Sequence, residues 1–100
     1  MNSIEIVIDN KTLKTEIYID NVKQTIIINN KEKEISKEKI EDLIRIIRTW
    51  KNNYHNQNVV DAESFFIKIN LNSETEIIKG NGSYPENYIL FKEWISDFNE

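Results

Sequence analysis

Residues 35–50, I-S-K-E-K-I-E-D-L-I-R-I-I-R-T-W, are the stretch that decides the fold, because they predict an amphipathic helix with a defined start. Ser36 precedes the periodic part, and as N-cap its side chain can accept a hydrogen bond from a free backbone N–H of the first turn. At about 100° per residue, the large apolar side chains fall on one side of this helix: Ile40, Leu43, Ile44, Ile46, Ile47 and Trp50. Such a face must be buried against another layer, which the rest of the chain has to supply.

The segments before this helix alternate apolar and polar residues with the period of β-strands. The alternation predicts strands at residues 4–8, 13–19 and 23–29, and a further short pairing segment at 33–35. Asn and Asp residues stand between these segments and favour tight turns. The first third of the chain is therefore expected to form an antiparallel meander.

After the helix, a polar segment is expected to form a long loop, and residues 65–71 and 75–80 then predict a hairpin joined at Asn72-Ser73. A second amphipathic helix is expected to begin near Pro85, a residue that suits a first helical turn. Together these elements predict one α+β domain over residues 1–100, in the order β-β-β-(β)-α-β-β-α. An antiparallel sheet of five or six strands would carry both helices on one face.

The composition excludes several kinds of site. The chain has no cysteine and one histidine, so disulfides and the usual zinc sites are not available, and we expect neither a metal nor a cofactor. The N-terminal residues lack the basic and apolar regions of a signal peptide, and no apolar run is long enough to span a membrane. We therefore expect a cytoplasmic protein.

The net charge of −4 comes from the second half of the chain. Residues 1–50 contain nine basic and nine acidic side chains, whereas residues 51–100 contain four basic and eight acidic ones. Because phosphate groups repel an acidic surface, direct binding to nucleic acid is not expected. An acidic surface is more compatible with a basic protein as partner.

His55, the single histidine, is the strongest catalytic candidate that the sequence offers. It lies in the polar segment after the central helix, with Asp61 and Glu63 a few residues on. A carboxylate that oriented the imidazole ring would make His55 a general base. The alternative is a solvated histidine on a loop, which is the commoner case, and nothing in the spacing requires catalysis.

Both glycines lie in the segment Gly80-Asn81-Gly82-Ser83, just before the second predicted helix. The backbone N–H groups of such a segment could bind an anion at the start of the helix. The alternative is a turn in which both glycines adopt positive φ angles. We favour the turn, because the chain has no phosphate-loop pattern.

A further set of apolar side chains is predicted on the sheet face that the helices leave uncovered. If most of the strand isoleucines face the helices, alternation assigns the following residues to the opposite face: Val7, Tyr18, Ile27, Phe66 and Ile78. An uncovered antiparallel face is normally polar, so these residues predict a surface for a partner protein or a second copy of the chain. The alternative is that strand-favouring residues are simply scattered there.

The junction before the last helix carries the most specific motif in the sequence: Gly80, then Ser83-Tyr84-Pro85-Glu86-Asn87-Tyr88, then Phe91. This junction, with the order of the preceding elements, resembles a family of small, uncharacterised bacterial α+β proteins. The resemblance implies a fold and no activity, so it transfers no catalytic residue to this chain.

Two classes of function remain for such a chain. The first is a non-catalytic protein-binding module that occludes a partner protein through its uncovered sheet face or its acidic second half. In general form the chain is similar to bacterial toxin-immunity proteins and to phage-encoded inhibitors such as anti-CRISPRs. The second is a small enzyme or ligand-binding domain that uses His55 with Asp61 and Glu63. We favour the first, because the chain has few nucleophiles, metal ligands or phosphate-binding loops.

Overall fold

The central amphipathic stretch folds as a helix in the computed structural model of the chain, which describes residues 2–56 and 63–98. Helix α1 (Lys37–Ile47) begins where the sequence predicts, since the side chain of Ser36 accepts a hydrogen bond of 3.1 Å from the backbone N–H of Lys39. Three side chains on its inner face are buried: Ile40, Leu43 and Ile47. The amphipathic pattern therefore identifies both the start and the buried side of α1 correctly.

The described residues form one seven-stranded sheet with the strand order β4-β3-β2-β1-β6-β7-β5. The strands are β1 (Ser3–Asp9), β2 (Lys14–Asp20), β3 (Thr25–Ile28), β4 (Lys31–Glu34), β5 (Asn53–His55), β6 (Ser64–Leu71) and β7 (Glu74–Asn81). All neighbouring strands are antiparallel except β5, which runs parallel to β7. With α1 and α2 (Tyr88–Ser96), the order is β-β-β-β-α-β-β-β-α.

The predicted α+β class is confirmed, whereas the predicted number of strands is too small. The short pairing segment before α1 exists as β4, and the additional strand is β5, in a segment predicted to be a loop. Two backbone hydrogen bonds hold β5 beside β7: Lys79 N–H donates to Asn52 C=O at 3.0 Å, and Asn56 N–H donates to Asn81 C=O at 2.9 Å. A strand of three mostly polar residues has no readable alternation, so its sequence could not predict it.

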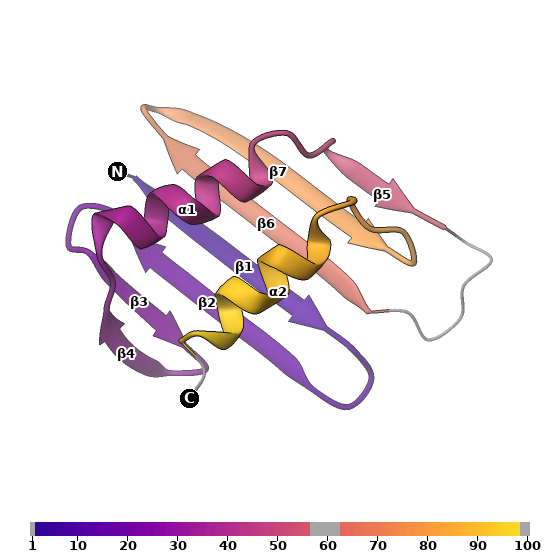
Figure 1. Cartoon of the computed structure of the whole chain (residues 1–100), viewed down its shortest axis with the longest axis horizontal. Coiled ribbons are helices and arrows are strands. Elements are labelled where there is room, and N and C mark those ends of the chain that lie inside the picture. Colours follow the sequence, from indigo (N-terminus) through magenta and orange to yellow (C-terminus); the bar gives the residue numbers. More distant parts are fainter. Residues whose placement is uncertain (1, 57–62, 99–100) are drawn as a thin grey trace.

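Both helices cover the same face of the sheet (Figure 1). The side chains between the two layers form one buried cluster, which includes Ile4, Ile6 and Ile8 of β1, Ile17 and Ile19 of β2, Ile26 and Ile28 of β3, Phe65, Ile67 and Ile69 of β6, Ile78 of β7, and Phe91, Trp94 and Ile95 of α2. The two helices are also joined directly, because the Trp94 indole donates a hydrogen bond of 2.9 Å to the backbone carbonyl of Lys39. Neither helix of the described chain has the length and hydropathy that crossing a membrane requires.

Helix α2 begins at Tyr88, three residues later than the predicted start at Pro85. The side chain of Asn87 fixes this boundary to the end of α1. It accepts a hydrogen bond of 2.5 Å from the Trp50 indole and donates one of 3.0 Å to the carbonyl of Ile46. The residues from Pro85 onward therefore form the corner that docks α2 against α1 before the helix starts.

Candidate protein-binding face

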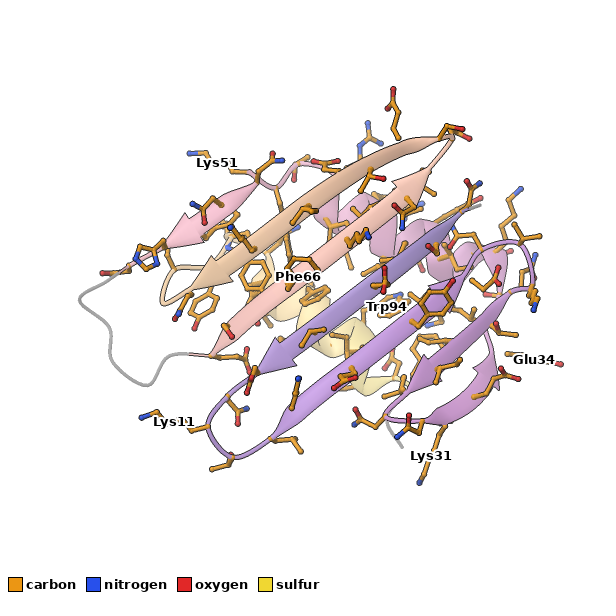
Figure 2. The ribbon with its side chains drawn as sticks, turned by 180° about the vertical axis from the view of Figure 1, so that it is seen from behind. Lys11, Lys31, Glu34, Lys51, Phe66 and Trp94 are labelled. Atoms are coloured by element: carbon orange, nitrogen blue, oxygen red, sulfur yellow. The ribbon has the colours of Figure 1, made fainter. Side chains whose placement is uncertain are left out.

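The sheet face opposite the helices is uncovered in the described chain (Figure 2). Phe66 stands on this near face in Figure 2, whereas Trp94 lies behind the sheet with the helices. Val7 lies directly opposite Phe66 across β1 and β6, and Tyr18 lies opposite Ile27 across β2 and β3. The strand register thus brings four of the five predicted residues together on one face.

The fifth predicted residue, Ile78, is on the other face. It is only 1% exposed, and it pairs with Ile67 within the core beneath the helices. Its neighbour Ile77 takes the outward position instead, with 41% of its surface exposed, opposite Lys68 of β6. The prediction for Ile78 is therefore wrong by one residue, and Ile77 is the residue that it missed.

The turn between β6 and β7 explains this correction. Asn72 and Ser73 have φ angles of 52° and 69°, which suit a two-residue hairpin turn with positive φ at both positions. This turn places Leu71 opposite Glu74, and the pairing of every later residue in the hairpin follows from that pair. In a run of two isoleucines only the turn, and not the apolar pattern, decides which one faces the core.

The outward apolar residues form a continuous band across five strands. In the order of the strands it consists of Ile77 (β7), Phe66 (β6), Val7 (β1), Tyr18 (β2) and Ile27 (β3). Successive members are either directly opposite or one row apart, which is within reach of large side chains. We call this set the apolar band. Phe66 and Ile77 are 37% and 41% exposed, and the other three are partly buried.

Charged side chains on the uncovered face are sorted by strand. The described outward residues of β6 and β7 include two lysines and no acid: Lys68 and Lys79. The described charged outward residues of β1 to β4 are mostly acidic, and the one base among them is Lys14. The acids are Glu5, Asp9, Glu16, Asp20, Glu32 and Glu34. We call these parts the basic half and the acidic half of the face, and the apolar band crosses both.

The structure does not assemble the predicted catalytic group around His55. His55 lies exposed on β5, beside an open hollow of about 490 Å³ that Lys79 and Phe66 also line. Glu63 is not among the residues that line this hollow, and Asp61 lies outside the described residues. The imidazole therefore has no described carboxylate from the predicted pair at its side.

Glu63 is instead engaged with the second helix and its corner. Its carboxylate accepts hydrogen bonds from the Tyr88 hydroxyl at 2.5 Å and from the Lys92 ammonium at 2.7 Å, while its backbone carbonyl accepts one from the Tyr84 hydroxyl at 2.6 Å. Partial burial acts to raise the pKa of Glu63, but the bonds from Lys92 and Tyr88 outweigh it, so that this pKa lies below its ordinary value. This cluster anchors α2 to the start of β6.

The two glycines have different roles. Gly82 has a φ of 78°, as the predicted turn requires. Gly80 lies within β7, where an added Cβ would stand 2.3 Å from Cε1 of Phe65, so it is needed for the close packing of that ring. The prediction of positive φ is therefore right for Gly82, while for Gly80 the requirement is space.

The described residues contain no group of three or more histidine or acidic side chains placed to hold a metal ion. Comparisons with protein-family models, with curated proteins and with solved structures find no match to this chain. The resemblance at the C-terminal junction accordingly stays a prediction, and the uncovered face is the candidate site.

Proposed function

We propose that this chain is a non-catalytic protein-binding domain, of the inhibitor or immunity type, that covers a partner protein with its uncovered sheet face. The observation that carries the proposal is the apolar band, which crosses five neighbouring strands on the side without helices. Apolar surface gains free energy when it leaves water, at about 25 cal/mol per Å². A partner that covered Phe66 and Ile77, the two most exposed members, would recover that free energy.

Two other candidate sites have less support. The acidic second half does not form one surface in the described chain, because Glu63 is bound to Tyr88 and Lys92, Glu76 lies on β7, and Glu93 lies on α2. An enzyme that used His55 would need a carboxylate to orient the ring, and Glu63 is committed elsewhere. The uncovered face remains the surface that fits a binding role best.

The test compares charge insertion on the two sides of the molecule. Phe66→Glu and Tyr18→Glu place a carboxylate in the apolar band, while Ile89→Glu places one on α2, where Ile89 is 70% exposed. A protein captured by the tagged wild-type chain in its native host is purified, and its affinity for each variant is measured by calorimetry. We expect the two band variants to lose binding and Ile89→Glu to retain it.

Thermal unfolding of each variant provides the control for folding, because all three replaced side chains lie outside the buried cluster. Full affinity in both band variants would exclude the uncovered face as the interface. Equal loss in Ile89→Glu would show that the interface includes the helical side.

A further inference from the structure

The two halves of the uncovered face are related to each other in a simple way. The strand order places β1 and β6 side by side, with β2 next to β1 and β7 next to β6. The line between β1 and β6 therefore has β2 and β7 at equal distances on its two sides. A two-fold axis that runs parallel to that line, just outside the uncovered face, lays β1 of one copy over β6 of another, and β2 over β7.

The first row of side chains is complementary under this rotation. The register places Glu16, Val7, Phe66 and Lys79 in one row across β2, β1, β6 and β7. Face-to-face packing about the line then sets Phe66 over Val7 of the second copy. In the same row, Lys79 is set over Glu16 of the second copy.

The adjacent row is complementary in the same way. It contains Tyr18, Glu5, Lys68 and Ile77, again across β2, β1, β6 and β7. The rotation sets Ile77 over Tyr18 of the second copy, and Lys68 over Glu5 of the second copy. In both rows, apolar residues meet apolar residues and each lysine meets a glutamate.

The charges also distinguish a two-fold axis parallel to the strands from the alternative two-fold axis, which is perpendicular to them. A two-fold axis perpendicular to the strands would lay the basic half over the basic half of the second copy, and the acidic half over the acidic half. Like charges that meet across an interface disfavour it. From this difference we infer that the uncovered face binds a second copy of the chain, about the axis parallel to the strands between β1 and β6.

The size of the face indicates a reversible dimer. The four strands that overlap, β2, β1, β6 and β7, lie about 4.8 Å apart, and their four rows of outward residues lie about 6.8 Å apart, which gives a footprint of roughly 520 Å² per copy. The four rows correspond to Ser3, Glu5, Val7 and Asp9 on β1. Stable interfaces bury about 800 Å² per partner, so a face of this size fits a weak, reversible dimer. Both helices would remain outside, on the far faces of the two packed sheets (Figure 1).

This inference rests on the proposed function, since it takes the uncovered face to be a protein-binding surface and names its occupant. Charge reversal tests it by sedimentation velocity of the full chain from low micromolar to millimolar concentration. Glu16→Lys and Lys79→Glu each create two like-charge contacts in the symmetric dimer, and each variant alone is expected to dissociate about ten-fold more readily. Glu16 and Lys79 are both exposed, and the Glu16 carboxylate forms an exposed ion pair with Lys14 at 3.5 Å.

An equimolar mixture of the two variants makes the test specific. In the mixed dimer both contacts join a base to an acid, because position 16 of one chain meets position 79 of the other in each case. We therefore expect the mixture to associate as tightly as the wild type. Glu93→Lys, a matched reversal on α2, should leave the dimer unchanged.

The possible outcomes separate this inference from the proposed function. A wild-type chain that stays monomeric, yet binds another protein in a manner sensitive to Phe66→Glu, overturns the dimer and leaves the proposed function standing. A wild-type dimer that neither charge reversal weakens, or a mixture that does not recover, also overturns the inference. Recovery in the mixture supports the face, the axis and the register together.

Discussion

Replacing Gly80 with alanine tests how the sheet is joined to the aromatic side of the core. The new Cβ would stand 2.3 Å from Cε1 and 2.6 Å from Cζ of Phe65, whereas carbon atoms attract one another at about 3.5–4.0 Å. The ring would have to move by roughly an ångström or more to reach that separation. It is held, however, by edge contact with Trp50 at 5.8 Å between centroids and by Tyr88 at 5.2 Å.

Overpacking of this kind costs about 1–3 kcal/mol, and the better strand propensity of alanine offsets at most about 1 kcal/mol of it. Each kcal/mol lowers the melting temperature by about 4–8 °C in a domain of this size. Urea and thermal unfolding of the wild type, Gly80→Ala, Phe65→Leu and the double variant measure the coupling. We expect Gly80→Ala to cost less in the Phe65→Leu background, where the smaller side chain leaves room.

Gly82→Ala is the matched control, because alanine there is strained by the backbone φ of 78°. Its cost should be the same whether position 65 carries phenylalanine or leucine. If Gly80→Ala leaves the stability of the wild type unchanged, or costs equally in both backgrounds, then Phe65 is not what requires a glycine at this position.

Two further predictions concern the contacts around α2. The pKa of Glu63 lies below its ordinary value of 4.5, so its ionised form stabilises the fold above that pH, and this contribution is lost as the pH falls through the folded-state pKa. The free energy of unfolding of Glu63→Gln should therefore fall less steeply than that of the wild type below about pH 4.5, as urea unfolding at a series of pH values would measure. The same pH dependence in both proteins would contradict this role of Glu63. Asn87→Ala removes the acceptor of the part-buried Trp50 indole and should cost about 1–3 kcal/mol in the same assay; a cost near zero would mean that water replaces the amide.

The alternation of apolar residues predicted most of the sheet, but it failed where it was not informative. Ile77 and Ile78 are both isoleucine, so the pattern could not decide which of them faces the core. The turn at Asn72 and Ser73 did hold that information, because a two-residue hairpin turn fixes the pairing of everything after it. The position of a recognised turn therefore predicts which residue of an apolar run faces the core, whereas the run itself does not.

Other features depend on contacts that the sequence does not record. Strand β5 is held by the edge of β7 and by the ring of Tyr54, whose centroid lies 6.3 Å from that of Phe65. The role of Gly80 likewise depends on Phe65, which is adjacent to it only after β6 and β7 have paired. Short edge strands and close-packing glycines are therefore consequences of tertiary structure, and local propensity is a poor predictor of them.

The division of the uncovered face into two charged halves reverses what the sequence indicates. By composition the second half of the chain is acidic, yet its strands β6 and β7 present Lys68 and Lys79 on this face. The first half is neutral by composition, yet its strands present mostly acids there, because Lys31 and Lys33 of β4 point to the helix side. Since β1 pairs with β6, the two sets meet along one line in the middle of the sheet. The two halves of the face carry opposite charges only because of this strand order, and the dimer that we propose depends on that arrangement.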